Sequence, residues 1–171
     1  MSRAGTIDGP RFALGREVIT GALTIADLPR LAEMGCEAAT LDYAVRGDES
    51  ADGHAALAVE VSGQLRLTCQ RCLGAFDFPL AATSTLELAG SESEIDAAED
   101  ERDRVLASKS MDVAALVEDE AILALPMVPM HASCEAAIAG AGRESASPFA
   151  ALAGLQESGA GPRGPGRKSN T

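Results

Sequence analysis

Four residues in two short segments carry side chains that could bind a metal ion. Cys69 and Cys72 stand in the segment LTCQRCLGAFDFPL, and His131 and Cys134 stand in PMHASC. Zinc is usually bound by four nitrogen or sulfur ligands of these kinds, arranged as a tetrahedron. The two pairs together therefore predict a Cys3His zinc site, although each pair alone is half a site and the pairs lie far apart in the chain.

The CxxC pair could instead act in redox chemistry or pack in the core. Redox activity favours a first cysteine at a helix N-terminus, where the helix dipole stabilises the thiolate. Gly74 and Pro79 disfavour a helix after the pair, so redox chemistry is the least favoured use. We predict a tight turn between two strands, here called the knuckle, that points both sulfurs to one side. Packing of Cys69 and Cys72 without a metal remains the alternative, and Cys36 is expected to pack after the first helix.

The elements around these residues are predicted from hydrophobic patterns. Strands are predicted within four segments: residues 17–23, 37–47, 54–69 and 75–88. Helices are predicted within three: residues 24–35, 112–125 and 148–156. Strands that follow one another without intervening helices favour an antiparallel sheet. The expected fold class is α+β, an antiparallel sheet of about five or six strands that could curl toward a barrel, with a few short helices.

The composition favours one cytoplasmic domain without a membrane segment. The 171 residues are 46% hydrophobic but only 3% aromatic, so the core should be modest. No apolar run reaches the roughly 20 residues of a membrane helix, and the first residues lack the apolar region of a secretory signal. Cytoplasmic thiols stay reduced, so the four cysteines are not expected to form disulfides.

The predicted domain spans residues 10–157. Residues 1–9 are expected to form a flexible N-terminus, and residues 158–171, rich in Gly and Pro, a disordered tail. Residues 88–108 are expected to form a mobile acidic loop, because the stretch 87–104 holds eight acidic and two basic residues.

The net charge of −12 argues against a generic nucleic-acid binder, because such proteins neutralise phosphates with Lys and Arg. A local basic patch could still contact RNA. Arg66 and Arg71, beside the cysteine pair, are the first candidates for contact with RNA or a protein partner, and the alternative for Arg71 is an exposed turn residue. The adjacent acids Glu118, Asp119 and Glu120 are expected to form a solvated helix face.

The sequence lacks the motifs of the common enzyme classes. It has no nucleophile elbow, no P-loop and no dinucleotide-binding glycine pattern, and it contains only two histidines. We therefore expect no enzymatic activity and no small-molecule substrate.

The order of these segments resembles the YceD-type family, the large ribosomal RNA subunit accumulation proteins. The resemblance rests on GQLRLTCQRCLGAFDFPL together with MDVAALVEDEAILALPMVPMHASC, and on PRFALGREVITGALTIADLPRL near the start. The segment SPFAALAGLQ is similar to the NPFA-x-L-x-x-L segment of some members. The resemblance covers about residues 10–156.

The resemblance implies a bacterial, cytosolic, non-enzymatic protein that supports accumulation or processing of 23S ribosomal RNA during 50S assembly. Its implied partners are the 23S rRNA precursor, large-subunit ribosomal proteins, or both. Other members look like zinc proteins with a second cysteine pair, where this sequence has His131 and Cys134. The implied metal site is thus either Cys3His or lost. The alternative function is a small zinc-stabilised cytosolic adaptor with no ribosomal role.

Overall fold

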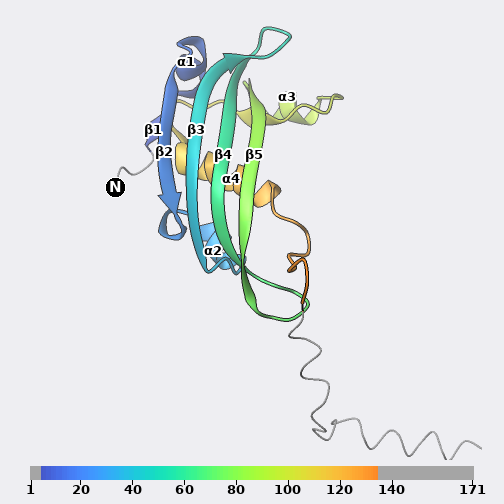
Figure 1. Cartoon of the computed structure of the whole chain (residues 1–171). Coiled ribbons are helices and arrows are strands. Elements are labelled where there is room, and N and C mark those ends of the chain that lie inside the picture. The colour runs from blue at the N-terminus through green and yellow to red at the C-terminus, as the bar shows by residue number, and fades with distance from the viewer. Residues whose placement is uncertain (1–4, 135–171) are drawn as a thin grey trace, which may run out of the picture. The chain divides into compact units, whose positions relative to one another are not determined.

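A five-stranded sheet lies at the centre of residues 5–134, the part of the chain that this computed structural model describes. The strand order is β2-β3-β4-β5-β6. The strands are β2 (Val18–Thr24), β3 (Ala38–Glu49), β4 (Ala55–Thr68), β5 (Ala75–Ala89) and β6 (Arg104–Leu106). Figure 1 shows β2 to β5 side by side, with helix α4 (Val113–Leu123) crossing behind them.

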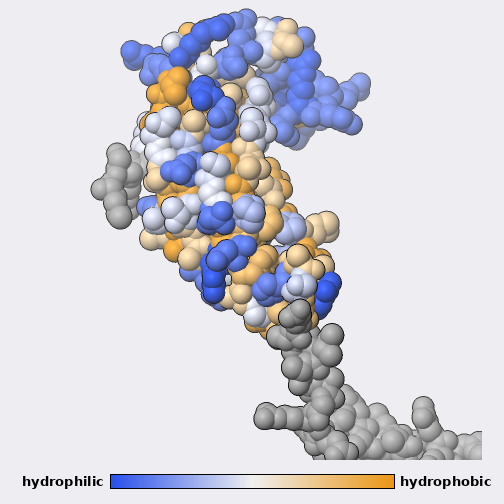
Figure 2. Space-filling view, in the orientation of Figure 1, coloured by the Kyte–Doolittle hydropathy of each residue, from blue (hydrophilic) through white to orange (hydrophobic). Residues whose placement is uncertain are grey.

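The pairs β2–β3, β3–β4 and β4–β5 are antiparallel, as the sequence pattern predicted. In β3, Leu41, Tyr43 and Val45 are buried, whereas Thr40 and Asp42 are exposed. This alternation gives the sheet one apolar face, which packs on α4, and one face toward solvent. Figure 2 shows the solvent face, with hydrophilic residues densest at the end that carries α3 (Glu92–Asp96). The α+β class is confirmed.

Strand β6 makes the sheet mixed rather than purely antiparallel, and here the prediction was wrong. Residues 90–103, which include α3, carry the chain back along β5, so that β6 pairs with β5 in parallel. Strand β6 has only three residues, too few for an alternation of apolar and polar side chains to be recognised in the sequence. The prediction of barrel-like closure was also wrong, because β2 and β6 are the two edges of the sheet and do not pair with each other.

The first described elements begin earlier than the sequence suggested. Strand β1 (Thr6–Ile7) pairs with β7 (Met111–Asp112), and helix α1 follows at Gly9–Leu14. The Asp8 side chain caps α1 by accepting a hydrogen bond from the Arg11 backbone N–H at 3.2 Å. The expected domain start at residue 10 therefore falls inside an element.

Two predicted helices are present and close the apolar face of the sheet. The first is a 3-10 turn, η1 (Ile25–Asp27), followed by α2 (Pro29–Glu33). The second is α4, capped at its start by the Asp112 side chain. The largest fully buried side chains are Leu23, Leu28, Leu31, Leu41, Leu57, Leu65, Val45, Val59, Val113, Val117 and Cys69.

The acidic residues of α4 are not a solvated face, contrary to the prediction. Glu118 is 3% exposed and Glu120 is 7% exposed, and only Asp119 faces solvent. The Glu118 carboxylate accepts hydrogen bonds from Arg30 Nε at 2.9 Å and from the Leu31 backbone N–H at 3.0 Å. This carboxylate therefore joins α4 to α2.

Residues 88–108, expected as a mobile acidic loop, contain the end of β5, helix α3 and strand β6. Their mobility stays a prediction. The predicted helix at 148–156 and the tail at 158–171 lie outside the described residues. Within residues 5–134, none of the helices combines the length and apolar character needed to cross a bilayer.

Candidate metal centre

The knuckle connects β4 to β5 and is closed by its own backbone. The Cys69 N–H donates to the Gly74 carbonyl at 2.9 Å, and the Leu73 N–H donates to the Cys69 carbonyl at 2.9 Å. Leu73 has a positive φ of 58°, a conformation that lets the chain turn sharply after Cys72. The strands on both sides fix the position of the turn, as the flanking residues predicted.

The second pair of candidate ligands is brought to the knuckle by the segment after α4. The helix ends at Leu123, ahead of Pro126, and the chain then runs on toward the knuckle. The Gln70 N–H donates to the Pro129 carbonyl at 2.9 Å, which fixes this segment against the knuckle. Two residues further on, the His131 N–H donates to the Cys69 sulfur at 3.4 Å.

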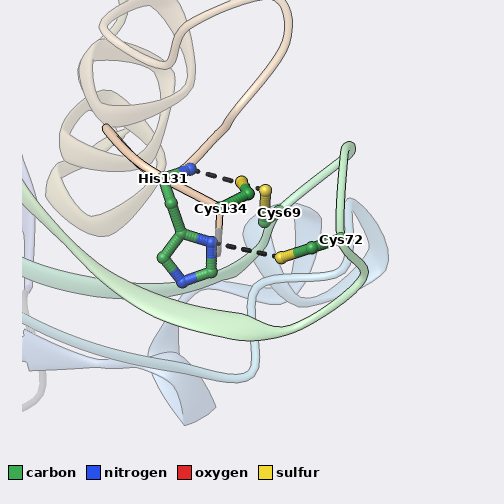
Figure 3. A group of neighbouring side chains, drawn as sticks. All are labelled: Cys69, Cys72, His131 and Cys134. Carbon is green, nitrogen blue, oxygen red and sulfur yellow. Dashed lines mark hydrogen bonds between the residues drawn. The ribbon is translucent and has the colours of Figure 1, made fainter. Parts of the chain in front are cut away.

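The four candidate ligands converge on one point. Figure 3 shows Cys69 and Cys72 from the knuckle facing His131 and Cys134 from the segment after α4. One ligand atom of each residue lies within 4.8 Å of all the others, and His131 Nδ1 lies 3.3 Å from Cys72 Sγ. Ligand atoms around a tetrahedral zinc ion, with Zn–S bonds of about 2.3 Å, would lie about 3.8 Å apart. The separations in the cluster, 3.3 Å for this pair and at most 4.8 Å for any other, lie on both sides of this spacing, so small side-chain shifts would let the four residues hold a metal ion.

Packing orients two of the four side chains. Cys69 is fully buried, whereas Cys72, His131 and Cys134 are partly exposed. The His131 ring packs against Phe76 of β5, with ring centroids 5.0 Å apart and an interplanar angle of 43°. This contact holds the imidazole beside the knuckle, in the orientation that turns Nδ1 toward Cys72.

The backbone around Cys69 favours its thiolate. Burial raises the pKa of this thiol, but hydrogen bonds from the backbone N–H groups of His131, Cys72 and Arg71 outweigh burial and lower the pKa to about 5. The thiolate is the form that binds metal. A low pKa would also suit a redox cysteine, and the sulfurs of Cys72 and Cys134 lie within 4.8 Å of the Cys69 sulfur. The convergence of four ligand atoms, rather than this pKa, is what favours metal binding.

The two arginines proposed as partner contacts differ in their surroundings. Arg66 forms a cross-strand ion pair with Asp77, with Nη1 and Oδ1 2.9 Å apart. Arg71 is exposed on the knuckle, and its Nη2 lies 3.7 Å from the sulfur of Met130. Within residues 5–134, Arg71 forms no ion pair, so its charge is the more available of the two.

An apolar groove beside the cluster was not predicted from the sequence. Its volume is about 510 Å³, and its lining includes Met34, Leu67, Ile122 and Leu125. Exposed apolar residues continue nearby, at Met127 and elsewhere in the segment after α4. The sequence hinted at this groove only through Met127 and Met130, which follow the proline at the end of α4.

One comparison with known proteins identifies the family. The model of the family "Large ribosomal RNA subunit accumulation protein YceD" matches residues 57–156, more than half of the chain. The match covers the knuckle, α4 and the segment that carries His131 and Cys134. No curated protein and no solved structure matches. The chain belongs to the YceD family of large ribosomal RNA subunit accumulation proteins.

Proposed function

We propose that this protein is a non-enzymatic, cytoplasmic factor that supports accumulation or processing of 23S ribosomal RNA during assembly of the 50S subunit. The observation that carries the proposal is the family match over residues 57–156, because it includes both halves of the cysteine–histidine cluster. The described residues add a fold in which those halves meet.

We further propose that Cys69, Cys72, His131 and Cys134 bind one zinc ion. Four protein ligands leave no open coordination position, so the ion would be structural rather than catalytic. A bound ion would tie the knuckle to the segment after α4, which are otherwise joined by a few hydrogen bonds such as that from Gln70 to Pro129. Zinc binding would then contribute to the stability of this end of the molecule.

The proposed contact with the assembling subunit is made mainly through basic ribosomal proteins. A chain with a net charge of −12 is attracted to basic proteins and repelled by phosphates. Arg71, exposed and without an ion pair in residues 5–134, is the proposed point of local contact with rRNA. Both kinds of contact depend on charge attraction, so the association should weaken as the salt concentration rises.

A second candidate function is a zinc-stabilised adaptor with no ribosomal role, which the cluster alone would equally support. Deletion of the gene separates the two. The proposal predicts a lower ratio of 23S to 16S rRNA and accumulation of 50S precursors, most clearly in cold or stressed cells. The wild-type gene and a Cys36→Ser control should restore the rRNA ratio, and a Cys69→Ser/Cys134→Ser variant should not. This result would show that the ribosomal role requires the zinc ligands. Unchanged ratios under all of these conditions would favour the adaptor.

A further inference from the structure

A second cavity lies away from the metal centre, between α4 and the β5–β6 edge of the sheet. Its volume is about 320 Å³. Its lining consists of Arg30, Leu86, Asp103, Arg104, Val105, Leu116, Asp119, Glu120, Ile122 and Leu123. A cavity of this size suits a side chain rather than a large ligand.

Glu120 is the unusual residue of this lining. It is 7% exposed, yet no hydrogen bond or ion pair joins its carboxylate to another residue within 5–134. Glu118, two positions earlier on the same helix, is buried to a similar degree and accepts two hydrogen bonds. Within residues 5–134 the fully buried side-chain oxygens without a hydrogen-bond partner belong to Ser84 and Glu87, so the Glu120 oxygens remain accessible from the cavity that the residue lines. A cation in the cavity would meet this unpaired carboxylate in a partly desolvated setting, where their attraction is stronger than at an open surface.

The two arginines in the lining do not supply that cation, because each is already bound to two carboxylates. Arg30 pairs with Glu118 and Asp119. Arg104 pairs with Glu87, at 3.3 Å, and with Asp100. Glu120 and Asp103 are therefore additional negative charges in the lining.

The rest of the lining is aliphatic. Leu86, Val105, Leu116 and Ile122 form the apolar wall, and Leu123 stands at the surface with 78% of its area exposed. A long side chain with a methylene stem and a charged end matches such a wall, because the stem packs on apolar surface while the charge meets a carboxylate.

We infer that this cavity binds a lysine or arginine side chain from a basic segment of a partner protein. The carboxylates exclude nucleic-acid phosphates by repulsion, and the aliphatic wall with its exposed Leu123 favours a peptide that carries apolar residues beside the basic one. Binding of a basic peptide can be tested on the purified protein alone, so its presence or absence is independent of the ribosomal role.

The test is an NMR titration of the full chain with two amidated peptides of equal length, KLAKLAKLAK and ELAELAELAE. The basic peptide should shift the amides of Val105, Leu116, Glu120 and Leu123, and the acidic one should not. Glu120→Gln should weaken binding of the basic peptide by about tenfold or more. It should leave the melting temperature unchanged or higher, because Glu120 makes no hydrogen bond or ion pair within residues 5–134 that the substitution would break. Asp42→Asn, on the open face of the sheet, is the control with the same loss of charge and should bind like the wild type.

The remaining outcomes decide against the inference. Equal weakening by Glu120→Gln and Asp42→Asn would mean attraction by net charge alone. Shifts of the same amides by spermidine, at the same affinity as the peptide, would mean a polyamine site instead of a protein-docking site. If Glu120→Gln failed to fold, Leu123→Ser would replace it, because that side chain is exposed; unchanged affinity in this variant would overturn the proposed apolar contact.

Discussion

The Nδ1 atom of His131 lies 3.3 Å from the Sγ atom of Cys72, although the two residues are 59 positions apart in the chain. The knuckle supplies the sulfur, and the segment after α4 supplies the ring. Around this contact the sulfurs of Cys69 and Cys134 complete a cluster with ligand atoms within 4.8 Å of one another. Each half is positioned by its own element, so the geometry of the site depends on the fold.

The first prediction concerns zinc content. Protein purified under reducing conditions should hold one zinc ion per chain, and removal with a chelator should lower its stability. At free zinc about 1,000-fold above its dissociation constant, the loss would be about 4 kcal/mol. Metal analysis combined with urea denaturation measures both quantities.

Matched cysteine variants sharpen this test. Cys69→Ser should lose the zinc, whereas Cys36→Ser should keep it, because Cys36 is buried away from the cluster and donates to the Ala38 carbonyl. A wild-type protein that contains no metal and is equally stable with and without added zinc would rule out the site.

The second prediction concerns the histidine ligand. His131→Cys should still bind one metal ion, because zinc accepts four thiolates as well as three thiolates and an imidazole. His131→Ala should bind it much more weakly. Cobalt substitution measures the change: the thiolate-to-cobalt absorption should increase in His131→Cys relative to wild type. The same absorption in both proteins would show that residue 131 is not a ligand.

The third prediction compares neighbouring acids on α4. Glu118→Ala should lower the free energy of unfolding by about 2–4 kcal/mol, because it leaves the Leu31 N–H and the Arg30 guanidinium without their buried acceptor. Asp119→Ala should cost less than about 0.5 kcal/mol, since its ion pair with Arg30 is exposed. Urea denaturation of the two variants gives the comparison, and equal losses would contradict the role assigned to Glu118.

The fourth prediction concerns acid. Burial raises the pKa of Glu87, but hydrogen bonds from Arg102 and Ser50 and the charge of Arg104 outweigh burial and lower it. A hydrogen bond from Arg104 lowers the pKa of Asp100 to about 2. Both carboxylates are thus more acidic in the folded protein than in the unfolded chain. The stability that they contribute is present above about pH 4.5 and is lost as the pH falls toward 2.

A Glu87→Gln/Asp100→Asn variant isolates this effect. Its melting temperature should be lower than that of the wild type at neutral pH, and the difference should shrink as the pH falls toward 2. Acid also releases zinc by protonating its ligands, but that effect is common to both proteins and cancels in the difference. A difference that stays constant down to pH 2 would refute the assignment.

The sequence predicted the elements that have a strong internal period. The spacing of apolar residues predicts strands β3 to β5 and helix α4. Cys36 is buried after α2, as expected. Strands β1, β6 and β7 have two or three residues each, too few for a period. They depend on pairing partners that lie elsewhere in the chain, which no local pattern reveals.

The candidate site divides in the same way. The knuckle could be predicted because Gly74, Pro79 and the alternating flanks are local signals. The contact between Arg30 and Glu118 spans 88 positions and has no local signal, so the burial of the α4 acids was missed. The meeting of the two ligand pairs was a hypothesis from residue types alone, and metal binding by them stays a prediction.

The most direct test of the proposed function is co-sedimentation of the full chain with precursor 50S particles at rising salt. The account predicts that the protein travels with these particles and not with mature 70S ribosomes, that the association weakens as the salt concentration rises, and that Arg71→Glu weakens it further. Protein that stays at the top of the gradient even at low salt and after crosslinking would contradict the role in large-subunit assembly.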